Sequence, residues 1–410
     1  MQLHQARAMR WSSSLPVCLA LWIGLLAGCS GGGDPAFSSE TNPVGGGASS
    51  SPFPEANDTV FVLVSDGNGG VYAGGRFTRV GQLPRQTLAH VTADGAVDPS
   101  WDPAADGPVT ALVLENQALY IGGSFFSVNG VERWRLAAVD RLSGELTAWN
   151  PKLGTANMVN ALASSGGVIY VGGVFELVNA AVVPGTGLRG EPRRNLAAVD
   201  ATTGLATPWN PNIFDGEIKA LVVGGSVVYA GGSFDQVGLM GQEAVRFNLA
   251  AFDVGSGMAT TWNPSVRGVA GDVVFALRVS EGVVYAGGRF DGIGGQTREN
   301  LAAVDRAASL ATSMNLPAND TVLSLFDDGR RLYVVGMFTT IGGQPRARLA
   351  AIDKATGLLT PWSPEANGPV HAIVVSGGRV FVGGEFTTIN GKPRNRLAVL
   401  DPESGQLVGE

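Results

Sequence analysis

One stretch of this 410-residue chain decides the fold: residues 321–362, which read TVLSLFDDGRRLYVVGMFTTIGGQPRARLAAIDKATGLLTPW. The stretch contains four short apolar runs rich in Val, Leu, Ile and Tyr, at 321–325, 331–338, 348–353 and 358–362. Turn-forming residues separate these runs, as Asp327-Asp328-Gly329, Ile341-Gly342-Gly343 and Ala355-Thr356-Gly357. The pattern predicts a unit of four antiparallel strands joined by tight turns.

The same unit recurs along the chain from residue 52 onward. A Gly-Gly-x-Phe mark or a close variant identifies seven copies, with the aromatic residue at Phe77, Phe125, Phe175, Phe234, Phe290, Phe338 and Phe386. The spacings of 48 to 59 residues suit a four-stranded blade. We therefore predict an all-β fold, a seven-bladed β-propeller of four-stranded antiparallel blades over residues 52–410. A β-solenoid is the competing repeat fold, but its coils are shorter and need no four-stranded unit.

The two ends of the repeat region predict how the ring closes. Aligning the seventh copy with the sixth places Glu410 where Trp362 stands, so the seventh copy lacks its own Trp. Residues 52–57, Pro-Phe-Pro-Glu-Ala-Asn, match the segment that follows Trp362. We expect this N-terminal segment to meet the last blade, with Phe53 in place of the missing Trp. Such closure leaves no unpaired sheet edge.

Two further residue types recur in the units. A large apolar Trp, suited to wedging between blades, lies in the outer strand at Trp101, Trp149, Trp209, Trp262 and Trp362. An Arg precedes every Leu-Ala pair by three residues, at Arg85, Arg133, Arg193, Arg246, Arg298, Arg346 and Arg394. These guanidinium groups either form a ring around an anionic ligand or pair with carboxylates and carbonyls of their own or the next blade. Presence in all seven copies favours the architectural role.

Two known repeat families resemble these units. The segment Ala198-Val199-Asp200, Thr203-Gly204 and Trp209 is similar to the tryptophan-docking motif of the pyrroloquinoline-quinone propellers, although its Trp comes one position later. Residues 91–98 resemble the delta-sixty repeat of bacterial surface proteins. The resemblance covers residues 52–410 and implies the fold more than any activity. The quinone enzymes use a neighbouring Cys pair and a calcium site; this chain has no such pair, so we predict no cofactor.

The N-terminal segment carries the marks of an export signal. Arg7 and Arg10 precede an apolar run at 15–27 that is too short to span a bilayer as a helix. The run ends in Leu-Ala-Gly-Cys at 26–29, which resembles the lipobox of bacterial lipoproteins. The resemblance implies a signal peptide at 1–28, lipidation of Cys29 and sorting to the outer membrane, on its periplasmic or cell-surface side. Residues 29–51 are rich in Gly and Ser and predict a flexible tether. An ordinary signal peptide is the alternative.

Charge and chemistry restrict the function. A formal net charge of −7 argues against nucleic-acid binding, which needs a basic surface. No His or Cys cluster has metal-ligand spacing, and no Gly-x-Ser-x-Gly elbow is present. His90 and His371 lie in apolar strands of distant units, where packing is the usual role. We assign no catalytic residue and no metal site.

Differences between the units predict the binding face. The connection from Phe to Leu takes 21 residues in the third unit (Phe175 to Leu196) and 15 in the fourth (Phe234 to Leu249), against 11 in the other five. The link after Trp262 is also long. Alternating strand direction places these connections on one face, where enlarged loops often bind partners. The candidate residues are Arg189, Glu191, Asp215, Glu217, Gln242, Glu243, Arg267 and Asp272.

These observations predict an outer-membrane-anchored propeller that acts as a binding or scaffolding module. Its partner would be an envelope protein or a surface glycan. Few aromatic residues, only Phe214 and Phe247, lie near the enlarged loops, which favours a protein. The alternative function is a polysaccharide hydrolase or lyase with acidic residues in the central funnel. A structural envelope component without a discrete ligand is the third possibility.

Overall fold

The computed structural model describes residues 53–154, 158–185, 187–239, 241, 243–267 and 271–409. The chain divides into two compact units at Ala48 and Ser49, and all of these residues belong to the second unit. The predicted signal peptide, Cys29 and the tether at 29–51, as well as Gln242 and Glu410, lie outside the described residues.

Seven sheets of three or four antiparallel strands make up the described part of the chain, and we number them as blades one to seven in chain order. Their strands are β1 (Val60–Ser65), β2 (Val71–Gly75) and β5 (Leu88–Val91); β6 (Val109–Glu115), β7 (Ala118–Gly123) and β10 (Leu136–Asp140); β11 (Met158–Ser165), β12 (Val168–Val174) and β15 (Leu196–Asp200); β16 (Glu217–Gly224), β17 (Val227–Ser233) and β20 (Leu249–Asp253); β21 (Val273–Ser280), β22 (Val283–Arg289) and β25 (Leu301–Asp305); β26 (Val322–Asp327), β27 (Arg331–Gly336), β30 (Leu349–Asp353) and β31 (Leu358–Leu359); β32 (Val370–Ser376), β33 (Arg379–Gly384) and β36 (Leu397–Leu400). The described residues contain no helix.

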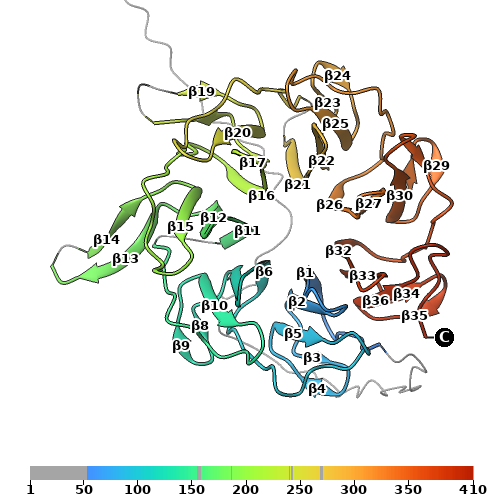
Figure 1. Cartoon of the computed structure of the whole chain (residues 1–410), viewed down its shortest axis with the longest axis horizontal. Helices are drawn as coiled ribbons and strands as arrows, with labels where there is room; N and C mark the ends of the chain where they lie inside the picture. The colour runs from blue at the N-terminus through green and yellow to red at the C-terminus, as the bar shows by residue number, and fades with distance from the viewer. Residues whose placement is uncertain are drawn as a thin grey trace, which may run out of the picture. The chain divides into compact units, whose positions relative to one another are not determined.

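The blades follow one another around a closed ring (Figure 1). The first strand of each blade is innermost and contacts the first strand of the next, in the order β1, β6, β11, β16, β21, β26 and β32. The ring closes because β32 contacts β1. The prediction of an all-β propeller is therefore confirmed.

A short hairpin follows the second strand of every blade, in the connection that runs from the repeated Phe to the Leu of the third strand. These seven hairpins are β3–β4 (Arg79–Val80, Leu83–Pro84), β8–β9 (Ser127–Val128, Val131–Glu132), β13–β14 (Leu177–Val183, Gly187–Pro192), β18–β19 (Gln236–Val237, Ala244–Val245), β23–β24 (Gly292–Ile293, Gln296–Thr297), β28–β29 (Thr340–Ile341, Gln344–Pro345) and β34–β35 (Thr388–Ile389, Lys392–Pro393). Each hairpin also makes a bridge to the chain that enters its blade, as Ala366 does with Ile389.

The predicted fourth strand is much shorter than expected. Only the sixth blade has one, the two-residue β31; the other described blades keep a single bridge, such as Val199 with Ala206. The pairing ends early whether or not a Trp follows: blade six has Trp362 and keeps β31, whereas blade five has Met314 at that position and keeps only the bridge of Val304 with Ala311.

The core consists of seven apolar clusters, most of which join one blade to the next. Glycine makes the close packing possible: a Cβ at Gly172 of blade three would lie 2.4 Å from Cγ2 of Ile218 in blade four. At the closure, a Cβ at Gly383 would lie 2.5 Å from Cγ1 of Val60. The glycines of the Gly-Gly-x-Phe mark thus accept the β-branched side chain of the neighbouring blade.

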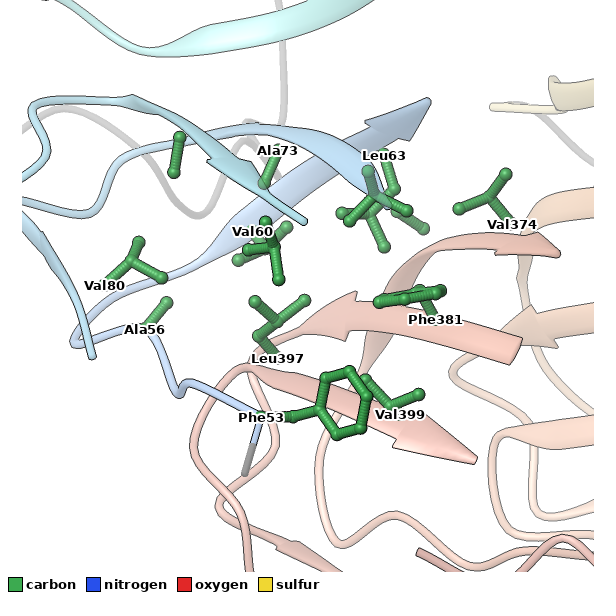
Figure 2. Close-up of a cluster of buried hydrophobic side chains, with 14 of the residues drawn as sticks. Phe53, Ala56, Val60, Leu63, Ala73, Val80, Val374, Phe381, Leu397 and Val399 are labelled. Atoms are coloured by element: carbon green, nitrogen blue, oxygen red, sulfur yellow. The ribbon is translucent and has the colours of Figure 1, made fainter. Parts of the chain in front are cut away.

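The N-terminal segment meets the last blade as predicted. The ring of Phe53 lies 6.1 Å from that of Phe381 at an interplanar angle of 85°. Ala56 donates its backbone N–H to the carbonyl of Asn395, and Glu55 pairs with Arg394 at 3.3 Å. Figure 2 shows Phe53 against the strands of blade seven, within the cluster that also contains Val60, Val399 and Leu397 of blades one and seven.

Candidate functional site

The seven repeated Arg side chains bind backbone carbonyls. In six of them Nη1 and Nη2 together bridge two segments: Arg246 donates Nη1 to the Val245 carbonyl at 2.8 Å and Nη2 to the Thr260 carbonyl at 2.7 Å. The other five bridges are made by Arg85, Arg133, Arg193, Arg298 and Arg346. Arg394 binds the Pro393 carbonyl and Glu55. Each bridge ties the hairpin side of a blade to its outer segment.

Four of the repeated Trp residues attach one blade to the next. The indole Nε1 of Trp149, Trp209, Trp262 and Trp362 donates to the carbonyl of the Asp that ends the third strand of the following blade, at 2.9 to 3.0 Å. Each of these rings also meets the edge of a Tyr of its own blade, as Trp209 does with Tyr170 at 5.1 Å. Trp101 is fully buried, but its Nε1 has no hydrogen-bond partner.

The enlarged connection of blade three forms the hairpin β13–β14, which projects from the ring (Figure 1). It has longer strands than any of the other six described hairpins. Two apolar side chains near its tip face solvent: Val182 is 70% exposed and Val183 is 40% exposed. Arg189 and Glu191 lie in β14 and are also exposed. The hairpin therefore presents an apolar tip beside charged residues.

A cavity of about 780 Å³ opens where the connections of blade four meet the link to blade five. It brings together three of the predicted residues, Asp215, Arg267 and Asp272, with Asp235, Phe247 and Asn248. These residues come from both kinds of enlarged connection, so the two kinds of connection share one face of the ring. The lining combines several carboxylates with one guanidinium and one aromatic ring.

Hydrogen bonds hold the walls of this cavity in place. Asn248 accepts the backbone N–H of Phe234 at 3.1 Å, and Asp215 accepts that of Asp235 at 3.2 Å. Arg289 donates Nε to the Gly271 carbonyl at 3.1 Å. Burial raises the pKa of Asp272, and the nearby carboxylate of Asp291 raises it further, while Arg289 acts in the opposite direction. The surroundings of Asp272 therefore favour its protonated form relative to a free Asp.

The remaining predicted residues do not line this cavity. Glu217 begins β16 and pairs with Lys219 of the same strand at 2.8 Å. Glu243 accepts the backbone N–H of Gly241 at 2.9 Å. Asp235 also lines the cavity but is not among the predicted residues. The sequence does distinguish it, because an acidic residue follows the Phe of the Gly-Gly-x-Phe mark in only three of the seven units, as Glu176, Asp235 and Asp291.

The centre of the ring contains a second cavity, of about 430 Å³, lined by the innermost strands. Its lining includes the cationic side chains of Lys219 and Arg278 and the imidazole of His371. The described lining residues include no carboxylate, and the nearby Glu217 and Glu385 pair with Lys219 and His371 at 2.8 and 3.1 Å. The acidic funnel of the hydrolase alternative therefore has no counterpart among the described lining residues.

His90 is built into the first blade. Its Nε2 lies 3.1 Å from Oδ2 of Asp66, and its Nδ1 lies 3.2 Å from Oδ2 of Asp98. Its ring stacks on Tyr72 at 4.5 Å. Both ring nitrogens thus have partners, and the side chain joins three segments of the blade. Among the described residues, these three included, no group of three His, Cys, Asp or Glu side chains is arranged to hold a metal ion.

Comparisons with known proteins agree with this architecture. A family model described as a domain of unknown function (DUF5122) beta-propeller matches residues 378–407. No curated protein matches the chain.

In the described part of the chain, no helix is long and apolar enough to cross a bilayer.

Several solved structures resemble the chain. The WD40 beta propeller domain of Doa1 is 12% identical, with a TM-score of 0.54 over 82% of this chain and 93% of that one. The computationally designed Ika8 protein is 16% identical, with a TM-score of 0.50 over 86% and 87%. The extracellular domain of the putative one component system BT4673 from B. thetaiotaomicron is 11% identical, with a TM-score of 0.52 over 83% of this chain and 38% of that one. At these identities the likeness shows the fold alone: the described residues form a β-propeller.

Proposed function

We propose that this propeller is a binding module that holds a partner protein against the face formed by the enlarged connections of blades three to five. The observations that carry the proposal are the hairpin β13–β14, with its two solvent-facing valines, and the cavity lined by Asp215, Arg267 and Asp272, both formed by the enlarged connections. The ring itself supplies a rigid frame, and the connections supply the variation.

The composition of this face suits a protein partner. Protein interfaces combine an apolar centre with a polar rim. Val182 and Val183 supply apolar area, and so does Phe247, which is exposed on the cavity side. Arg189 and Glu191 of β14 supply charges in the same hairpin as the two valines.

The test replaces the apolar tip without removing the hairpin. A Val182→Asp/Val183→Asp variant of the full chain and a Leu142→Asp control are used as bait in envelope extracts. Leu142 is equally apolar and exposed but lies in a turn on the opposite face. We expect the tip variant to lose at least one protein that the wild type and the control retain.

Two outcomes would speak against this assignment. An identical set of captured proteins for all three chains would show that the hairpin tip is not the binding site. Loss of ligand in an Asp215→Asn variant but not in the tip variant would move the site into the cavity. It would also favour a surface glycan, whose hydroxyl groups carboxylates bind and whose sugar rings pack on an aromatic side chain such as Phe247.

We also propose that the chain is anchored to the outer membrane through lipidated Cys29, with residues 29–51 as a tether. The support is the sequence Leu-Ala-Gly-Cys after a short apolar run. Several acyl chains hold a protein stably, whereas one gives marginal binding. A Cys29→Ser variant should leave the outer-membrane fraction and should not incorporate labelled fatty acid. Equal membrane association and labelling of the two chains would overturn the proposal.

A further inference from the structure

The fifth blade departs from the others at the position of the repeated Trp. Met314 stands there, in the sequence Thr-Ser-Met that replaces Thr-x-Trp. The backbone is equivalent: Met314 donates its N–H to Oγ1 of Thr312 at 3.3 Å, as Trp209 does to Thr207 at 3.3 Å. The exchange thus changes the side chain without changing the path of the chain.

The other interfaces show what this position normally holds. In four of them an indole ring packs on a Tyr of its own blade and donates Nε1 to a carbonyl of the following blade. The corresponding Tyr here is Tyr285, and the corresponding carbonyl is that of Asp353, at the end of β30. A Met side chain has no N–H, so this carbonyl lacks the indole donor that its counterparts accept.

The missing ring leaves a cavity of about 400 Å³ between blades five and six. Its walls include Tyr285, Met314, Leu332, Ile352 and Leu358, and the backbone from Lys354 to Gly357. This size is within the range of small-molecule sites. Leu358 is exposed, so the cavity has an apolar rim.

The surroundings of the turn residue Gly357 are independent evidence that the space opposite Met314 is empty. In three interfaces that keep the Trp, a Cβ built on the turn glycine of the following blade would meet the indole ring: it would lie 3.4 Å from Trp149 at Gly204, 3.2 Å from Trp209 at Gly257, and 3.4 Å from Trp362 at Gly405. At Gly357, the equivalent residue opposite Met314, the same Cβ meets nothing within 4 Å. Met314 therefore does not fill the volume that an indole occupies elsewhere.

We propose that the Met314 cavity is a binding site for a small planar aromatic molecule with a ring N–H, of which indole is the simplest. The ring would pack against Tyr285 and Met314, and its N–H would donate to the Asp353 carbonyl. The chain itself provides the precedent, since the same ring occupies the same place in four other interfaces. Tyr285, Met314, Leu332 and Ile352 supply apolar surface for the ring, and Thr312, Asn315, Lys354 and Thr356 supply polar groups in the same lining.

The test uses indole as the probe and a filled cavity as the control. Titration of the full chain with indole should show one saturable site and a rise in the melting temperature, since a ligand that binds only the native state stabilises it. A Met314→Trp variant supplies the missing ring covalently. We expect it to melt about 2 °C higher than the wild type without ligand, and to bind indole at least tenfold more weakly.

A reciprocal variant keeps the proposal falsifiable if Met314→Trp fails to fold. Trp362→Met should lower the melting temperature and create a second cavity, so that two equivalents of indole bind instead of one. Methyl-labelled methionine adds a direct readout, because the Met314 resonance should shift on indole addition while that of exposed Met258 stays in place. Unchanged indole affinity in Met314→Trp, or an unshifted Met314 resonance at indole saturation, would overturn the site.

Discussion

At the scale of single residues, the propeller relies on side chains that satisfy backbone groups. The guanidinium of Arg246 bridges the carbonyl of Val245, in the hairpin, and that of Thr260, in the outer segment, and its counterparts make equivalent bridges. The planar fork of Arg suits two fixed acceptors, whereas Lys offers a single point charge. The repeated Arg therefore ties the hairpin of a blade to its outer segment.

Removing one such fork should lower stability. Arg246→Ala loses two charge-assisted hydrogen bonds, and we expect the free energy of unfolding to fall by about 2 kcal/mol, measured by urea denaturation. Arg189→Ala, in exposed β14, is the matched control and should change it by less than about 0.5 kcal/mol. Ligand binding lost at an unchanged urea midpoint would show that Arg246 serves a ligand instead.

At the scale of elements, the turn after the third strand depends on one carboxylate. Oδ1 of Asp200 accepts the backbone N–H of Thr202 and Thr203 and the hydroxyl of Thr203, at 3.0, 2.7 and 2.8 Å. These bonds, with the Thr203 N–H as the largest contribution, lower the pKa of Asp200. The pKa values of Asp140, Asp253, Asp353 and Asp401 are lowered in the same way.

The sign of the pKa change predicts acid sensitivity. A carboxyl with a lowered folded pKa adds stability above its unfolded pKa of about 3.9, and this stability is lost as the pH falls through the folded pKa. At pH 7, Asp200→Ala should reduce the free energy of unfolding by about 0.5–1 kcal/mol, because the turn is exposed to solvent. Near pH 2 the difference from the wild type should largely vanish in urea denaturation. A difference that stays constant with pH would show that the charge does not matter.

At the scale of the whole molecule, stability comes from contacts between neighbouring blades, made by residues that are distant in sequence. Six of the seven blades accept a β-branched side chain of the next at a glycine, blade six having Val335 there, and four blades add an indole that reaches across. The closure between blades seven and one repeats this arrangement with Val60 at Gly383 and Phe53 beside Phe381 (Figure 2). The ring is thus held together by equivalent interfaces, one of which joins the two ends of the described chain.

The closure can be weakened at one aromatic residue. Phe53→Ala removes a buried ring from the interface between blades seven and one, and we expect the free energy of unfolding to fall by about 3 kcal/mol. Phe126→Ala removes a ring that is largely exposed and should cost less than about 1 kcal/mol. Calorimetric unfolding of both variants and of the wild type tests these two expected losses of stability. Equal melting of Phe53→Ala and the wild type would mean that the N-terminal segment does not carry the closure.

Local patterns were sufficient to predict the blade. Short apolar runs, the glycine-containing turns between them and the repeated Phe act over a few residues, so their meaning does not depend on the rest of the chain. The match between residues 52–57 and the segment after Trp362 was enough to predict the closure, because a repeat must be complete to pair its edge. The length of the fourth strand was not predictable in this way, since the runs at 358–362 and in the other units have the same local pattern whether they form a strand or a single bridge.

What the tertiary structure alone decided is which residues of different units meet. Asp215 and Asp272 belong to different connections and share one cavity because blades four and five lie side by side. Met314 looks like an ordinary apolar residue until Tyr285 and the turn of the next blade are placed around it. Repeat patterns report the structure within a unit, whereas these sites are formed between units, so their geometry exists only once the ring has closed.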